Sequence, residues 1–219
     1  MDIVFGFPAP IIFALLLNEM RGKRFKRIVQ TVTYIPNFIS MVVVCGLLYT
    51  FLGRSGLIND IIAMFGGERS NLLANPNLFK SIFVSSGIWQ GFGWGSIIYL
   101  AALTSIDQAL YEAATIDGAG RFKQVLHITL PGLVPTIMIL LILRMGGLFS
   151  VGFEKVILLY NDLTMEKADV ISSFLYRRGL INADFSYAAA VGLMNTLINF
   201  IVLCLSNVLS KRMTENSLW

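Results

Sequence analysis

Residues 111–135, YEAATIDGAGRFKQVLHITLPGLVP, are the only long segment in the middle of the chain that is not membrane-like. Glu112-Ala113-Ala114 begins a predicted helix, and Asp117-Gly118 interrupts it, because glycine turns through positive φ at little cost. A second short helix is predicted from the helical spacing of Phe122, Val125, Leu126 and Ile128. Pro131 is expected to end that helix and to begin the next one. The stretch therefore predicts a helix–turn–helix elbow between two apolar spans, small enough to fit a groove on another protein.

These residues also carry a resemblance to a known family. The runs Glu112-Ala113-Ala114, Asp117-Gly118-Ala119 and Ile128-Thr129-Leu130-Pro131 resemble, with the right spacing, the EAA loop of permease subunits in binding-protein-dependent ABC importers. The whole chain is similar to the sugar-uptake (maltose-transporter-like) branch, above all to permeases for polysaccharides and oligosaccharides. The resemblance implies a type I importer bundle in which residues 107–131 form a cytoplasmic coupling loop that docks into a cleft of the ATPase subunit. Val125 departs from the family, since many relatives have an aromatic residue there.

The composition indicates an integral membrane protein, and the resemblance implies an all-α fold with one permease domain over residues 1–219. The chain is 56% hydrophobic and 14% charged, with a mean hydropathy of +0.72, whereas soluble domains are about 45–50% apolar and about 25% charged. The net charge of +4 does not indicate nucleic-acid binding, because the cations lie mostly at the ends of apolar spans. A multi-pass protein of the bacterial cell membrane is expected.

Five spans are predicted, since about twenty apolar residues cross a hydrocarbon core of roughly 30 Å. The predicted spans cover residues 3–17, 33–52, 79–105, 133–151 and 186–210. The connecting segments 20–30, 106–132 and 210–219 hold nine Lys and Arg residues, against seven in the longer segments 53–80 and 152–184. This bias places the basic loop 21–27, the elbow and the tail in the cytoplasm, and it places 53–80 and 152–184 outside as polar segments. Within 53–80, an interfacial helix is predicted from the apolar positions between 57 and 65, with Ser55 near its N-cap.

The third span carries a stripe of small residues beside a polar edge. Gly87, Gly91 and Gly95 recur every four residues, a spacing that lets another helix approach closely. The polar edge consists of Ser86, Gln90 and Trp94. It suits either a substrate path along a subunit interface or hydrogen bonding between helices.

Polar side chains inside the last two spans are further candidates. Arg144 lies within the span 133–151, and its helical neighbours offer no counter-ion. Two hypotheses remain: Arg144 hydrogen-bonds the substrate in the path, for example the carboxylate of a uronic-acid-containing oligosaccharide, or it is a structural residue tied to carbonyls or to a partner subunit. Asn195 and Asn199 share one face of the last span, and Asn195 is the remaining substrate-path candidate.

Other functions have little support in the sequence. There is no G-x-x-x-x-G-K-[ST] phosphate loop, so ATP and Mg²⁺ are expected in partner ATPase chains and no cofactor is expected in this one. One His and scattered Ser residues make no catalytic set, and no metal site is suggested. Cys45 and Cys204 are interpreted as small buried hydrophobes.

The partners that the resemblance implies are a second permease, two ATPase subunits, an extracytoplasmic binding protein and an oligosaccharide or polysaccharide fragment. The alternative function is a secondary transporter or a non-transporting membrane scaffold, in which the elbow is only a connector. A secondary transporter is expected to carry intramembrane carboxylates, and every Asp and Glu lies in a predicted loop or near a span end. No cleavable signal peptide is visible; either a helix is missing upstream or the first span begins directly at the N-terminus.

Overall fold

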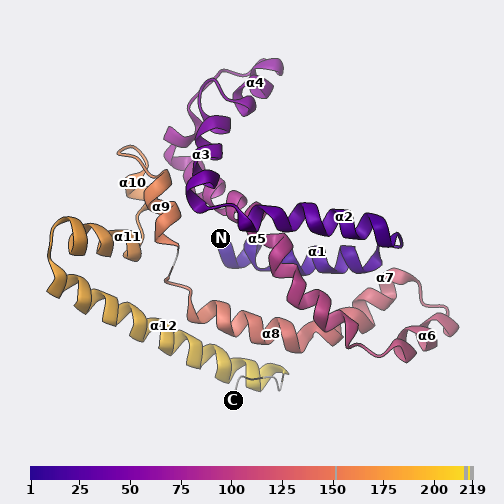
Figure 1. Ribbon diagram of the computed structural model, residues 1–219. Coiled ribbons are helices and arrows are strands. Elements are labelled where there is room, and N and C mark those ends of the chain that lie inside the picture. Colours follow the sequence, from indigo (N-terminus) through magenta and orange to yellow (C-terminus); the bar gives the residue numbers. More distant parts are fainter. Residues whose placement is uncertain (151, 215–216, 218–219) are drawn as a thin grey trace. The chain divides into compact units, whose positions relative to one another are not determined.

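The computed structural model of the protein describes residues 1–150, 152–214 and 217, and these residues form helices and their connections, without a strand (Figure 1). They divide into two compact units, one of residues 1–37, 88–146 and 200–219 and the other of residues 38–87 and 147–199. The α-helices are α1 (Pro8–Glu19), α2 (Lys23–Tyr34), α3 (Met41–Leu52), α4 (Leu57–Met64), α5 (Pro76–Thr104), α6 (Gln108–Ile116), α7 (Arg121–Gln124), α8 (Leu130–Gly146), α9 (Phe153–Leu159), α10 (Met165–Ala168), α11 (Ile171–Tyr176) and α12 (Phe185–Thr214). Short 3₁₀ turns cover Ile35–Phe38 and Leu72–Ala74, and π turns cover Asp2–Gly6, Val125–Thr129 and Arg177–Ile181.

The core of the first unit joins α1, α5 and α8. Its buried side chains are Ile11 and Ala14 of α1, Tyr99 and Leu103 of α5, and Leu133 of α8. Glycines at both ends of α8 allow close contacts with other segments. A Cβ at Gly132 would lie 2.8 Å from Cδ1 of Ile106, in the connection after α5, and one at Gly146 would lie 2.5 Å from Cδ1 of Leu203 in α12. The start and the end of α8 are therefore both held by close contacts.

The predicted glycine stripe is confirmed in part, and the closest approach lies beside it. A Cβ at Gly95 would lie 3.1 Å from Pro10 Cγ of α1, whereas one at Gly91 would meet nothing within 4 Å. The tightest contact is made by Gly93, where a Cβ would overlap the Thr33 carbonyl of α2. Backbone cannot give way as a flexible side chain can, so Gly93 is the position of α5 in this unit where a side chain is least tolerated.

The core of the second unit gathers helices from segments that are polar in sequence. Cys45, Leu73, Phe79, Leu159 and Ala168 form its buried cluster. Asn59 is fully buried: its amide donates to the carbonyls of Gly53 and Ser70, both at 2.8 Å, and its side-chain oxygen accepts from the Ser70 N–H at 3.0 Å. Lys155 is also buried; its ammonium donates to the Phe83 carbonyl at 2.8 Å and lies 4.7 Å from the centre of the Phe83 ring.

Four helical segments of the described chain are long and apolar enough to cross a membrane: Asp2–Glu19, Met41–Met64, Arg121–Gly146 and Phe185–Arg212. They overlap four of the five predicted spans. The predicted span 79–105 is one continuous helix, α5, with 29 residues, but it is not among these four. Its Ser, Gly and Gln residues reduce its hydropathy below that of the others.

Several predicted boundaries were wrong. The basic loop 21–27 lies mostly in α2, and the predicted span 33–52 is interrupted by the 3₁₀ turn at Ile35–Phe38, so that α3 begins only after Ser40, whose hydroxyl accepts from the Val43 N–H at 3.4 Å. The helix at 57–65 exists as α4, but its N-cap is Gly56, not Ser55. The segment 152–184, which was predicted as a polar outer loop, is largely helical, because Val156 and Leu159 of α9 become buried.

The fourth predicted span also ends earlier than expected, since α8 stops at Gly146. Its predicted last residue, Val151, lies outside the described residues, as do four positions of the C-terminal tail. Arg144 is therefore in the last turn of α8 and not in the middle of a span. A cation in this position is favourable with the helix dipole.

The contact at Gly93 can be tested with a matched pair of substitutions in the same helix. Gly93→Ala should destabilise the protein by about 1–3 kcal/mol, because the added methyl overlaps the Thr33 carbonyl. Gly91→Ala should leave stability unchanged or slightly higher, since the new methyl meets open space and alanine favours a helix. Thermal unfolding of the detergent-purified protein measures both. Equal effects of the two substitutions would show that α5 and α2 do not pack closely.

Candidate functional site

The turn of the elbow is built by the left-handed backbone of Gly118, whose φ is +75°. It ends α6, which begins one turn earlier than predicted: the Asp107 side chain accepts from the Ala109 N–H at 2.9 Å. At the other end, the Ala119 N–H donates to the Ala114 carbonyl at 2.8 Å, and the Gly118 N–H donates to the Thr115 carbonyl at 3.1 Å. This pair of bonds is a Schellman motif. The predicted turn at Asp117-Gly118 is confirmed.

Side-chain hydrogen bonds brace the two arms of the elbow. The Gln124 amide donates to Thr115 Oγ1 at 3.0 Å and to the Ala119 carbonyl at 3.1 Å. Farther along, the hydroxyl of Tyr111 lies 3.0 Å from that of Thr129, which is buried. These contacts link α6 to α7 and to the π turn that follows. The elbow is therefore held at one angle on both sides of its glycine.

The second arm continues into the next span without a break. Pro131 was predicted to end the helix, but α7, the π turn Val125–Thr129 and α8 form one helical segment over Arg121–Gly146. In an ordinary α-helix, the ring of Pro131 would clash with the carbonyl four residues earlier. The π turn changes the register before the proline, since the Leu130 N–H donates to Val125, five residues back. A displacement of the elbow is thus connected directly to α8.

The elbow presents an exposed surface of mixed chemistry. Ile116 and Phe122 have exposed fractions of 87% and 80%, unusually high for large apolar side chains. Of the coupling residues predicted from sequence, Glu112, Ala113, Asp117, Gly118 and Pro131 are exposed, while Ala114, Ala119 and Leu130 are half-buried. Glu112 was expected in the first turn of its helix, but it lies in the second turn of α6. Exposed apolar groups beside a carboxylate suit a protein partner.

The substrate-path candidates do not form one cluster that the structure defines. Gln90 and Trp94 lie one turn apart on α5, where Trp94 is exposed and Gln90 is half-buried. Ser86, on the same edge, is buried and donates to the Phe83 carbonyl at 3.2 Å. In the second unit, Asn199 accepts from the Phe149 N–H at 3.1 Å and donates to Ser150 Oγ at 3.1 Å. Asn195 differs, because its side-chain oxygen is buried without a partner among the described residues.

Arg144 has a counter-ion within the chain, contrary to the sequence analysis. Its Nη2 forms an ion pair with Oδ2 of Asp2, and both side chains are 53% exposed. Asp2 lies in the candidate span Asp2–Glu19, and Arg144 lies in Arg121–Gly146. A sequence separation of 142 residues hid this pairing. Charged side chains in spans generally occur in such pairs.

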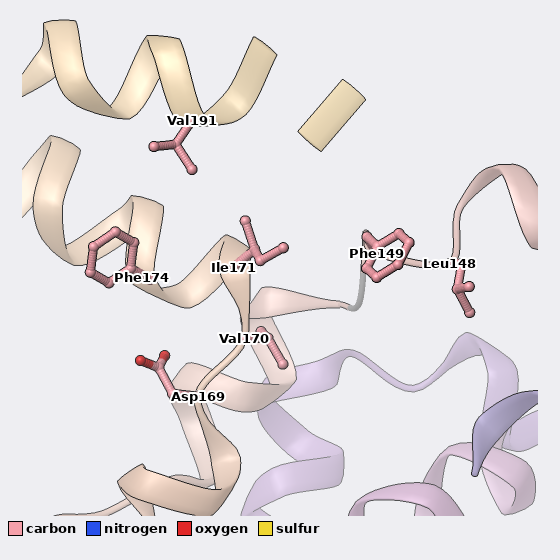
Figure 2. A pocket seen from close by; sticks show the side chains of 7 residues that line it. All are labelled: Leu148, Phe149, Asp169, Val170, Ile171, Phe174 and Val191. Atoms are coloured by element: carbon pink, nitrogen blue, oxygen red, sulfur yellow. The ribbon is translucent and has the colours of Figure 1, made fainter. Parts of the chain in front are cut away.

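A cavity of about 400 Å³ in the second unit lies beside α11 and α12. Figure 2 shows its lining: Ile171 and Phe174 of α11, Val170 before them, Val191 of α12, Leu148, Phe149 and Asp169. Asp169 accepts hydrogen bonds of 2.5 Å from Ser173 and from Arg177. Burial alone would raise the pKa of Asp169, but these bonds and the charge of Arg177 outweigh it and hold the pKa below its ordinary value of 3.8. The carboxylate is thus used within the fold, and the cavity offers mainly apolar contacts.

Comparison with known proteins identifies the family. Residues 6–215 match the family described as the inner membrane component of binding-protein-dependent transport systems. The chain belongs to this family. The permease is 44% identical to the polygalacturonan/rhamnogalacturonan transport system permease protein YteP of Bacillus subtilis and 40% identical to protein LplB of the same organism. Both alignments cover the whole chain, and they cover 68% and 69% of those two proteins.

Solved structures agree with this membership. A chain of a bacterial ABC transporter that imports the acidic polysaccharide alginate matches the permease with a TM-score of 0.95 at 45% identity, over 97% of the permease and 75% of that chain. A second structure, of a bacterial alginate ABC transporter in complex with an alginate pentasaccharide-bound periplasmic protein, matches with a TM-score of 0.96 at 44% identity, over 99% and 76%. The predicted family, the all-α fold and the inner-membrane location are confirmed.

Sequence reasoning missed the residues that brace the elbow. Its two arms are held by Tyr111, Thr115, Gln124 and Thr129, and only Thr129 lies in the runs that carried the resemblance, where it had been given no role. The sequence did contain a pattern that could have indicated these hydrogen bonds, because polar side chains occur on both sides of the Gly118 turn, within reach of one another. Asp2 was missed for another reason: the first span was predicted to begin at residue 3, which left this carboxylate outside.

The ion pair of Asp2 and Arg144 can be tested with a double-mutant cycle. Arg144→Gln alone leaves the Asp2 carboxylate unpaired, and Asp2→Asn alone leaves the Arg144 guanidinium unpaired. The double variant Asp2→Asn/Arg144→Gln should therefore lose less stability than the sum of the losses in the two single variants. The coupling should be about 0.5 kcal/mol or more. Thermal unfolding of the purified permease complex provides the free energies.

The control cycle combines Asp2→Asn with Arg212→Gln, whose guanidinium forms no ion pair among the described residues. These two substitutions should be additive. Additivity in the Asp2–Arg144 cycle as well would show that the pair contributes nothing to the fold.

Proposed function

We propose that this permease forms half of the translocation path of an ATP-driven importer for acidic oligosaccharides or polysaccharide fragments. The observation that carries the proposal is the braced elbow, continuous with a membrane helix, in a chain of the binding-protein-dependent family. The substrate class is supported by the relatives: YteP is named for polygalacturonan and rhamnogalacturonan, and the solved transporter imports alginate. The identities of 44% and 45% make the same class of substrate the first choice for this chain.

The elbow is the proposed docking site for an ATPase subunit. Its exposed Ile116 and Phe122 would enter an apolar groove, and Glu112 would accept charge-assisted hydrogen bonds from the rim. ATP and Mg²⁺ would be bound by two partner ATPase chains. A second permease would complete the path, and an extracytoplasmic binding protein would deliver the sugar. Closure of the ATPases would then move α6, and the braces at Gln124 and Tyr111 would pass this movement to α8.

The proposed orientation puts the elbow in the cytoplasm. The Arg121 guanidinium lies 3.9 Å from the Glu19 carboxylate, so the turn after α1 lies beside the start of α7. The basic cluster of residues 21–27 follows Glu19 directly. Both features therefore belong to the same side, and cation-rich connections favour the cytoplasmic side.

In the first unit, Gln90, Trp94 and Arg144 are the residues proposed to contact the substrate. The Trp94 indole suits the apolar face of a sugar, and the Gln90 amide suits its hydroxyls. In the second unit the proposed residue is Asn195, whose side-chain oxygen is buried and has no hydrogen-bond partner among the described residues. For Arg144, a uronate would compete with Asp2 for the same guanidinium. This makes an acidic sugar a chemically matched ligand.

The secondary-transporter alternative was judged from the position of the carboxylates, which were predicted in loops or near span ends. The three that fall within candidate spans do lie near the ends: Asp2 and Glu19 are the first and last residues of Asp2–Glu19, and Asp60 precedes the end of Met41–Met64 by four residues. Each has an arginine partner: Arg144, Arg121 and Arg69 respectively. Carboxylates held by arginine are poorly suited to bind and release a coupling ion. This pairing and the family membership favour the importer.

The coupling role can be tested with two substitutions in the elbow. Gly118→Val should destroy the turn, because a β-branched residue is strained at a φ of +75°. Glu112→Lys should leave the turn intact and reverse the charge offered to the partner. Both are expected to lower substrate-stimulated ATP hydrolysis at least tenfold in the reconstituted complex, measured with an alginate or polygalacturonate oligosaccharide delivered by its binding protein.

Gly120→Val is the matched control for Gly118→Val. Gly120 has a φ of −68°, and a Cβ there meets nothing within 4 Å, so valine should be tolerated. Normal uptake and normal stimulation in Gly118→Val and Glu112→Lys would remove the coupling role. Stimulation by every oligosaccharide tested except the acidic ones would leave the coupling role intact and overturn the substrate class.

A further inference from the structure

Helix α2 has one apolar and one basic face, and the described residues of the chain do not cover the apolar face. Phe25, Ile28, Val32 and Ile35, the last just beyond the helix end, follow one another at helical spacing with exposed fractions between 54% and 61%. Lys23, Lys26 and Arg27 lie on the opposite side, and Arg24 flanks the stripe. None of the residues of α2 is fully buried. This helix is not among the candidate spans, so its apolar stripe needs another explanation.

The charge of α2 is confined to one end. Arg21, Lys23, Arg24, Lys26 and Arg27 occupy the preceding turn and the first half of the helix, and residues 28–40 contain no cation. These five side chains form no ion pair among the described residues. No acidic residue occurs between Glu19 and Asp60. The cluster is thus a compact positive charge that the chain itself does not neutralise.

We propose that the first half of α2 binds the headgroups of anionic phospholipids at the membrane face that carries the elbow. The cations would lie at the level of the lipid phosphates, while Phe25, Ile28 and Val32 contact the acyl chains below them. A bilayer supplies both chemistries at the required spacing, since its phosphates lie directly above its hydrocarbon. Clusters of four to eight cations beside a span are attracted to anionic lipid in this way.

The apolar stripe favours lipid over an acidic protein surface as the occupant. A water-soluble partner could pair with the cations, but it would leave the exposed stripe in water along the whole length of the helix. The Glu19–Arg121 contact also connects this region to the elbow. Bound anionic lipid would therefore lie close to the segment that receives force from the partner. The proposal concerns lipid binding and does not depend on which substrate is transported.

The test measures lipid that co-purifies with the complete transporter. The complex is reconstituted in an equimolar mixture of phosphatidylglycerol and phosphatidylcholine and re-extracted, and the ratio of the two retained lipids is determined by mass spectrometry. Arg24→Gln/Arg27→Gln should lower the apparent affinity for phosphatidylglycerol about fivefold for each cation removed. Arg24→Lys/Arg27→Lys should retain most of the enrichment, because the charge is kept.

The matched control is Arg54→Gln/Lys80→Gln, which removes the same charge from two exposed positions outside α2. It should leave the lipid ratio unchanged. An equal loss in the control would mean that only net charge matters, and it would overturn the proposal. An unchanged lipid ratio in Arg24→Gln/Arg27→Gln would also overturn the proposal. If that variant kept its lipid ratio but lost its ATPase subunits, the cations would serve a protein contact instead. Thermal unfolding of each variant identifies any loss of fold.

Discussion

The left-handed backbone of Gly118 is the constraint on which the coupling geometry depends. It allows the two bonds that end α6, and it thereby places Thr115 and Ala119 where Gln124 can reach them. The hydrogen bond between the hydroxyls of Tyr111 and Thr129 links α6 to the π turn Val125–Thr129. That π turn allows the helix to continue past Pro131 without a break. The turn at Gly118 thus connects the exposed elbow to a helix that is apolar enough to cross the membrane.

The carboxylates within the candidate membrane spans are paired: arginines accompany Asp2, Glu19 and Asp60. The buried Lys155, in α9 outside those spans, donates to a carbonyl beside an aromatic ring. Water is scarce in a bilayer, so an unpaired charge or hydrogen-bonding group is costly there. The side-chain oxygen of Asn195 is buried without a partner among the described residues, and the five cations of residues 21–27 form no ion pair there. Both are proposed to bind ligands from outside the chain, a sugar and a lipid.

The parts of the fold that could be predicted from sequence are those set by local chemistry. The turn at Gly118 follows from a glycine and its helical flanks, and the helix over 185–214 follows from a continuous apolar run. The glycine stripe was predicted as a packing surface, but spacing alone could not show that Gly93, beside the stripe, makes the closest contact. Which glycine makes the closest contact depends on which helix packs against α5, and this is set by the tertiary structure.

Long-range contacts explain the predictions that failed. Nothing near Arg144 in sequence indicates Asp2. Residues 152–184 look like a polar loop, yet α9 forms because its apolar side chains Val156 and Leu159 are buried in the second unit. Pro131 is a helix terminator by its own chemistry, and only the preceding π turn cancels that effect. The predicted coupling residues come from their motif, whereas the hydrogen bonds that brace the elbow required the structure.

The central claim is that the elbow faces the cytoplasm, where an ATPase can reach it. Single cysteines in a background without Cys45 and Cys204 test this in intact cells with a membrane-impermeant thiol reagent. Ser70, Lys123 and Asn182 are all exposed in the structure, so accessibility of the side chain itself is matched. Ser70→Cys and Asn182→Cys should be labelled from outside, and Lys123→Cys should be labelled only after the cells are opened. Labelling of Lys123→Cys in intact cells would contradict the account.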